Sequence, residues 1–259
     1  MTFKADSRLV DAIVPAVNVE PRRKRLKPTL LVLHYTGMSS SARAVDWLAR
    51  QESRVSCHYV IDEAGRITQL VPERLRAWHA GVSEWQGADD INSRSIGIEI
   101  HNPGHDHGYP DFPKPQMQAV LALSKDIVRR NKITPEGVLA HSDVAPERKI
   151  DPGEKFDWAW LAHEGLGVWV KPSPVKQDDA GLGPGSRDGL VREAQKLLAA
   201  YGYGVPQTGE LDHRTSKVLR AFQLHFRQGR VDGRLDRSTF LTLKRLVASH
   251  APLVKRARV

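Results

Sequence analysis

The 259-residue sequence predicts an α/β protein: a mixed central sheet flanked by helices, followed by a small three-helix domain. Two observations carry this prediction. Segments with strand patterning alternate with segments of helical periodicity as far as residue 164, which is typical of a sheet covered by helices. A stretch rich in proline and glycine then follows, and after it the patterning is only helical. We expect a leader at 1–27, the α/β domain at 28–169, a linker at 170–187, the helical domain at 188–249 and a basic tail at 250–259.

The α/β domain begins with an apolar run at residues 30–34, which predicts a buried strand that ends in His34. Serines before residues 40–50 are available to cap a helix there. Residues 1–27 have no clear periodicity and are expected to be irregular. The remaining expected strands are 55–61, 67–71, 96–100 and 138–140, and the remaining expected helices are 115–130 and 157–164.

The helical domain contains an internal repeat. Residues 209–215 recur as residues 233–239, and each copy places an aspartate, Asp212 or Asp236, directly before a helical pattern. An aspartate at this position accepts hydrogen bonds from the first free backbone amides of a helix. Together with a helix at 190–201, the repeat predicts a compact three-helix unit.

Composition and charge exclude some classes of protein. The sequence contains no run of eighteen apolar residues, so no transmembrane helix is expected. The N-terminal residues do not have the pattern of a secretory signal. Cys57 is the only cysteine, so the chain cannot form an internal disulfide. The net charge of +9 favours an anionic partner, and the basic run 22–27 is expected to be a solvated segment. Nucleic-acid binding through that surface is a weaker hypothesis, since no nucleic-acid-binding motif supports it.

A candidate metal site centres on the loop of residues 141–153. His141 and Asp151 lie at its two ends, and imidazole nitrogen and carboxylate oxygen are both ligands that zinc accepts. A catalytic zinc site needs three protein ligands and one open position. His34, at the end of the first buried strand, is the best candidate for the third ligand.

Five motifs occur in an order that resembles a known family, the zinc-dependent N-acetylmuramoyl-L-alanine amidases of the type 2 amidase family, which also includes peptidoglycan recognition proteins. The resemblance covers roughly residues 28–168. The motifs are Leu33-His34-Tyr35-Thr36, Ser56-Cys57-His58-Tyr59-Val60-Ile61, Trp78-His79-Ala80-Gly81, Ser95-Ile96-Gly97-Ile98-Glu99, and His141-Ser142-Asp143 with Lys149-Ile150-Asp151-Pro152-Gly153.

The resemblance implies roles for individual residues. His34, His141 and Asp151 fall on the family's zinc ligands. Glu99 falls on the group that moves the proton from water to the leaving nitrogen, and Lys149 on the group that stabilises the oxyanion. The bound Zn²⁺ would activate water and polarise the substrate carbonyl.

The same motifs suggest the substrate cleft, in which Trp78 and His79 are expected to contact sugar or peptide. Cys57 and His58 could instead suggest a thiol hydrolase. Adjacent residues of a strand point to opposite faces of the sheet, so this pair cannot act together as nucleophile and base.

Residues 188–247 resemble the type 1 peptidoglycan-binding domain, although glycine turns and aspartate caps alone would also explain the pattern. Together the resemblances imply a zinc amidase that cleaves between N-acetylmuramic acid and L-alanine of peptidoglycan or muropeptides. A peptidoglycan-binding protein without catalysis is the alternative. A wall-binding domain favours a location in the cell envelope, in the periplasm, while the missing signal pattern leaves a cytoplasmic location open.

Overall fold

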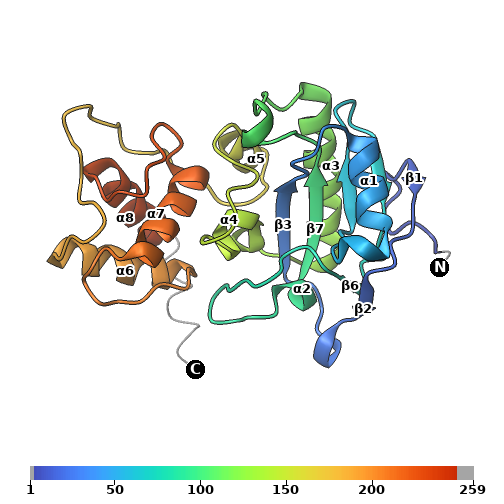
Figure 1. Cartoon of the computed structure of the whole chain (residues 1–259), viewed down its shortest axis with the longest axis horizontal. Coiled ribbons are helices and arrows are strands. Elements are labelled where there is room, and N and C mark those ends of the chain that lie inside the picture. The colour runs from blue at the N-terminus through green and yellow to red at the C-terminus, as the bar shows by residue number, and fades with distance from the viewer. Residues whose placement is uncertain (1–2, 250–259) are drawn as a thin grey trace. The chain divides into compact units, whose positions relative to one another are not determined.

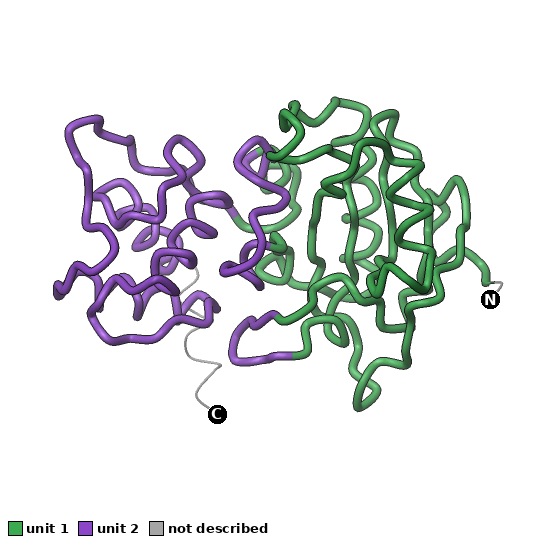
Figure 2. Tube along the Cα trace, viewed as in Figure 1, with its two compact units in different colours: residues 1–82, 90–141, 160–168 green, residues 83–89, 142–159, 169–259 purple. Residues whose placement is uncertain are grey.

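The computed structural model describes residues 3–249. The predicted basic tail, 250–259, lies outside the described residues. Contacts divide the chain into two compact units, which Figure 2 distinguishes by colour. Unit 1 contains the described residues up to 82 together with 90–141 and 160–168, and unit 2 contains 83–89, 142–159 and the described residues from 169 onward.

Unit 1 is built on a mixed six-stranded sheet, as the sequence predicts. Four neighbouring strands, which include one edge of the sheet, run parallel, while β5 is antiparallel to β4. In spatial order the strands are β1 (Ala12–Ile13), β5 (Ile67–Gln69), β4 (Tyr59–Ile61), β7 (Ser95–Ile100), β3 (Leu30–Tyr35) and β8 (Val138–Ala140).

Helices cover this sheet (Figure 1). They are α1 (Ser41–Ala49), which contacts β4, and α3 (Lys114–Asn131), which contacts β3 and β4. The shorter helices of the chain before residue 170 are α2 (Ile91–Arg94), α4 (His141–Val144) and α5 (Trp158–His163). Ser40 caps α1 by accepting a hydrogen bond from the backbone of Arg43 at 3.3 Å. Nearly every residue of β3 and β7 is buried, which is typical of parallel strands that are covered on both faces.

The N-terminal residues are not the irregular leader that the sequence suggested. β1 pairs with β5, and β2 (Val19–Pro21) pairs with β6 (Leu75–Ala77) in a second, two-stranded sheet. Nor is the whole basic run solvated, because Arg22 is only 7% exposed and donates hydrogen bonds to the carbonyls of Glu73 and Ser95. Several acceptors thus satisfy its buried guanidinium, which no sequence periodicity could indicate.

The strand expected at 55–61 is shorter than predicted, since β4 begins only at Tyr59. The preceding residues bond elsewhere: the backbone of Ser56 donates to Trp78 and its hydroxyl donates to Asn18. Alternation of apolar and polar residues therefore overestimated the paired length.

Unit 2 contains the three predicted helices, α6 (Gly189–Tyr201), α7 (His213–Phe226) and α8 (Arg237–Ser249). Asp212 and Asp236 cap α7 and α8 at 2.7 and 2.6 Å, as the repeat predicts. The repeat extends to two buried glutamines. Gln195 accepts a hydrogen bond from the backbone amide of Gly209, and Gln223 accepts one from that of Gly233, each at 2.8 Å. No helix within residues 3–249 is long and apolar enough to span a bilayer.

A buried histidine in unit 1 predicts acid sensitivity. His58 is fully buried, and burial, together with the nearby Arg22, lowers its pKa from 6.5 to about 3. As the pH falls below about 6.5, the unfolded chain therefore takes up a proton that the folded chain does not. We expect this group to lower the free energy of unfolding by about 1.4 kcal/mol per pH unit between those two pKa values.

Urea unfolding of the metal-free protein at several pH values below neutral measures this effect. Replacing His58 by glutamine should reduce the slope of the free energy of unfolding against pH by the contribution of one histidine. The buried His79, whose pKa is also lowered, should still contribute a slope of the same sign. An unchanged slope in the variant would contradict the assignment.

Candidate metal centre

Three of the predicted site residues lie in one row across the sheet. In the parallel pairing of β3 with β7, His34 is opposite Glu99. On the other side of β3, Leu33 is opposite Ala140, the last residue of β8, and His141 follows directly. Because paired residues of neighbouring strands face the same side of a sheet, the register brings these residues together at the carboxyl ends of the parallel strands.

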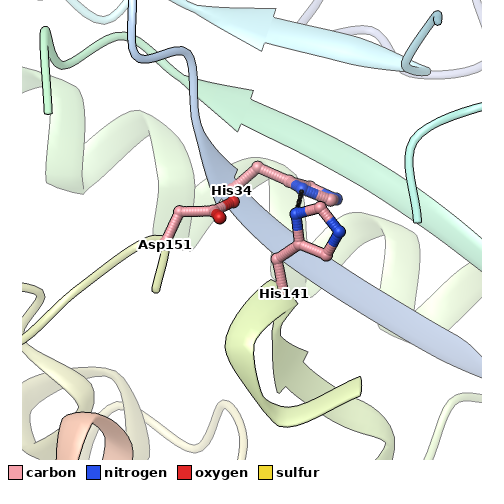
Figure 3. Close-up of side chains that lie close together, drawn as sticks. All are labelled: His34, His141 and Asp151. Atoms are coloured by element: carbon pink, nitrogen blue, oxygen red, sulfur yellow. Dashed lines mark hydrogen bonds between the residues drawn. The ribbon is translucent and has the colours of Figure 1, made fainter. Parts of the chain in front are cut away.

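His34, His141 and Asp151 form the group that could hold a metal ion. One ligand atom from each lies within 4.8 Å of the other two, and all three residues are buried. Figure 3 shows the side chains converging from β3, from the start of α4 and from the loop that follows α4. The ligand set predicted from the sequence is thus assembled in space.

The hydrogen bonds around His34 determine which ring nitrogen carries its proton. The Ser95 hydroxyl donates to the Ile91 carbonyl at 2.7 Å, so it accepts from Nε2 of His79, 3.0 Å away. Nδ1 of His79 is then an acceptor, and it receives the proton of His34 Nε2 at 2.9 Å. In its neutral form, His34 consequently presents the lone pair of Nδ1 to the site.

His141 is held in the same way. Its Nε2 lies 3.3 Å from the carbonyl of Ala80, which can only accept, so the neutral ring has its lone pair on Nδ1. The Nδ1 atoms of His34 and His141 are 2.8 Å apart, the contact marked in Figure 3. With these tautomers no proton lies between the two atoms. Two imidazole nitrogens and a carboxylate oxygen within 4.8 Å of one another fit a divalent cation such as Zn²⁺.

His79 lies behind His34 in the protein interior. It is 8% exposed, and burial, followed by the nearby His34, lowers its pKa well below the usual value, so the ring is neutral as the tautomers require. Gly97 on β7 makes room for it, since a Cβ there would lie 2.6 Å from the His79 ring. The substrate contact predicted for His79 stays a prediction; the geometry instead gives its ring the task of orienting His34.

We expect substitution of His79 by alanine to weaken metal binding by about 10- to 100-fold, because His34 would lose the acceptor that fixes its tautomer. Competition with a chromogenic chelator measures the affinity. Substitution of the exposed His163 on α5 is the matched control. Equal affinities in the two variants would show that His79 does not orient the ligand.

Glu99 and Lys149, the residues expected to act in catalysis, have different settings. Glu99 is partly exposed on a strand whose isoleucines are fully buried, and its place opposite His34 puts it in the row that holds the metal group. Lys149 is partly exposed on the loop, two residues before Asp151. It lines a cavity of about 80 Å³ together with Lys217 and Arg220. The roles of both residues remain predictions.

Trp78, the expected substrate contact, and Cys57, the excluded nucleophile, differ in exposure. Trp78 follows β6 and is partly exposed, which is compatible with the predicted substrate contact. Cys57 is fully buried, and burial raises the pKa of its thiol well above the usual value. A buried, protonated thiol is not a nucleophile, which agrees with the exclusion of a thiol hydrolase.

Sequence reasoning missed the residues that support the ligands. Ser95 and Gly97 lie in one of the five family motifs, yet nothing in the sequence indicated a role for them. Asn92 was not singled out at all, although its side-chain oxygen accepts hydrogen bonds from the backbone amides of His79 and Ala80 at 3.0 and 2.8 Å. The available signal was a glycine inside a strand, which often marks close approach of another group.

Comparison with known proteins gives matches to both parts of the chain. Residues 24–154 match the family model described as N-acetylmuramoyl-L-alanine amidase, and residues 187–243 match one described as putative peptidoglycan binding domain. The N-acetylmuramoyl-L-alanine amidase AmiD of Escherichia coli (strain K12) is 39% identical over 223 residues, covering 81% of this chain and 79% of that protein.

Two solved structures are similar over most of the chain. AmiD from E. coli, in complex with the substrate anhydro-N-acetylmuramic acid-L-Ala-D-gamma-Glu-L-Lys, has a TM-score of 0.73 and 36% identity, covering 87% of this chain and 90% of that chain. AmpDh3 from Pseudomonas aeruginosa has a TM-score of 0.73 and 34% identity, covering 88% and 93%. The chain therefore belongs to the N-acetylmuramoyl-L-alanine amidase family and is an enzyme of that class.

Proposed function

We propose that the protein hydrolyses the amide bond between the lactyl group of N-acetylmuramic acid and L-alanine in peptidoglycan or muropeptides, with Zn²⁺ held by His34, His141 and Asp151. The observation that carries this proposal is the buried group of two imidazoles and one carboxylate, with ligand atoms within 4.8 Å of one another, in a chain of this family. The name and substrate complex of AmiD support the same bond.

The residues of the chain would divide the chemistry among them. A bound zinc ion would supply Lewis-acid polarisation of the scissile carbonyl and lower the pKa of a water molecule. Glu99, in the same row of the sheet as His34, would take a proton from that water and deliver it to the leaving nitrogen. The ammonium of Lys149 would stabilise the oxyanion as negative charge develops.

The cavity beside Lys149 suggests how an anionic group of the stem peptide is held. Arg148, Lys149, Lys217 and Arg220 line it with a single acid, Glu147. Such a lining favours anionic groups, and stem peptides carry carboxylates. At about 80 Å³ the cavity has room for a small anionic group, and we therefore assign one carboxylate of the stem peptide to it.

The domain boundaries expected from the sequence are part of the proposal: a catalytic domain at 28–169, a linker at 170–187 and a peptidoglycan-binding domain at 188–249. The match at residues 187–243 supports the last of these and associates the protein with the cell wall. A location in the cell envelope follows from that association. Binding of peptidoglycan without catalysis is disfavoured, because all three expected ligand positions hold residues of types that can bind a metal ion.

Mass spectrometry of purified peptidoglycan after incubation with the protein tests the function. We expect free stem peptides that begin at L-alanine, their loss with a chelator and their recovery when zinc is restored. If muropeptides stay intact in every condition while the protein sediments with the sacculus, hydrolysis is refuted and binding of peptidoglycan without catalysis takes its place.

A further inference from the structure

The loop that carries Asp151 belongs to the same compact unit as the three C-terminal helices. We call residues 142–159 the metal-ligand loop; Figure 2 draws it in the colour of α6, α7 and α8. Within the loop, the backbone amide of Ser142 donates to the carbonyl of Asp151 at 3.0 Å. The position of Asp151 is thereby coupled to the first residues of the loop, and whatever fixes those residues also fixes the ligand.

A buried carboxylate at the start of the loop is bonded to the helices. Tyr203 donates its hydroxyl to Oδ1 of Asp143 at 2.6 Å, and Nδ1 of His225 lies 2.7 Å from Oδ2. The side chains of Asp143 and His225 are 0% and 1% exposed. A carboxylate so deeply buried needs hydrogen-bonding partners, and each of its two oxygens has one on the C-terminal helical domain.

Aromatic packing fixes the same histidine. The His225 ring stacks on Trp158 of the loop at 3.8 Å and on Phe226 of α7 at 3.9 Å. Nearby, the side chain of Gln228 donates to the carbonyl of Phe156 at 2.8 Å. The later part of the loop is therefore attached to the helices as well as its beginning.

The segment 83–89 reinforces the attachment. The amide of Glu84 donates to the carbonyl of Val144 at the end of α4, and the amide of Gln86 donates to the carbonyl of Gly202 after α6, each at 2.8 Å. Gly202 is needed at this point, because a Cβ would lie 2.8 Å from the ring of Trp85. The segment thus joins the metal-ligand loop to the end of α6.

We propose that the C-terminal helical domain positions the metal ligand Asp151, with Tyr203 and His225 as the positioning residues that act through Asp143. This inference rests on the proposed function in taking Asp151 as a ligand. It gives the domain a task beyond attachment to the wall: the helices hold the loop that completes the metal site, so metal affinity depends on residues that contact neither metal nor substrate.

Variants of the full-length protein test the proposal. Tyr203→Phe removes one hydrogen bond to Asp143, and His225→Phe removes the other while keeping a flat ring between Trp158 and Phe226. Thr215→Val is the matched control, since Thr215 is fully buried in the same domain and bonds to Gln195, away from the loop. Zinc affinity is measured by competition with a chromogenic chelator, and ligand geometry by the visible absorption of the Co²⁺-substituted protein.

We expect each phenylalanine variant to bind zinc about tenfold more weakly than Thr215→Val, and the double variant to bind more weakly still, with an altered cobalt spectrum. Sedimentation with sacculi should be unchanged. If His225→Phe fails to fold, Tyr203→Phe, which loses only a hydroxyl, decides the matter. Zinc affinity and cobalt spectra equal to those of the control would overturn the inference. Because both readouts are independent of hydrolysis, a wild-type protein that binds zinc without cleaving peptidoglycan would refute the proposed function and leave this inference standing.

Discussion

Replacing His34 by alanine is expected to abolish hydrolysis, leaving no more activity than in chelator-treated wild-type protein. The residue is 1% exposed and contributes one of the three ligand atoms of the metal group. Its removal leaves one imidazole and one carboxylate, too few for a catalytic zinc site. Metal content by atomic absorption after dialysis, together with release of stem peptides, measures both losses.

The control for this variant is His163→Ala, which removes an exposed histidine from α5. It should retain metal and activity. Thermal unfolding in the presence of chelator separates loss of the ligand from loss of the fold. Full activity in a His34→Ala protein that folds would refute the assignment of the metal group.

Replacing Glu99 by glutamine should have a different signature: kcat falls by about 10²- to 10⁴-fold while zinc affinity is retained. Glutamine keeps the shape of the side chain but cannot accept and return a proton at neutral pH. Because Glu99 lies opposite His34 on β7, it adjoins the metal group without belonging to it. Steady-state kinetics on a soluble muropeptide, with chelator competition on the same protein, separates the two effects.

Glu63→Gln is a suitable control, since Glu63 is a half-exposed glutamate of the same unit. It should leave kcat unchanged. A Glu99→Gln protein with wild-type kcat would remove Glu99 from catalysis, and one that lost zinc would make it a structural support of the metal site instead.

The residues of the metal group could be singled out from the sequence because each follows from local pattern. His34 ends an apolar run, and His141 and Asp151 bound a short loop, so both the strand ends and the ligand types were visible. The motif resemblance then chose among the histidines. Their meeting in space required the sheet register, which spacing alone does not give.

The support of the ligands could not be predicted, because it depends on contacts between distant segments. His79 bonds to His34, 45 positions away in the chain, and Tyr203 bonds to Asp143, 60 positions away. Arg22 looked like one more residue of a basic run, whereas its environment in the fold makes it interior. In the helical domain, by contrast, the helix caps could be predicted, because a cap depends only on neighbouring residues. The repeat that contains Asp212 and Asp236 indicated these caps directly.

The row formed by His34, Glu99 and His141 has a consequence for assembly of the holoenzyme. Backbone pairing of β3 with β7 and β8 sets the spacing of these groups before any ion arrives. A zinc finger, in contrast, acquires its structure only when the ion binds. We therefore expect the apoprotein to fold before it takes up the ion, so that it can be purified folded and then reconstituted with a chosen ion.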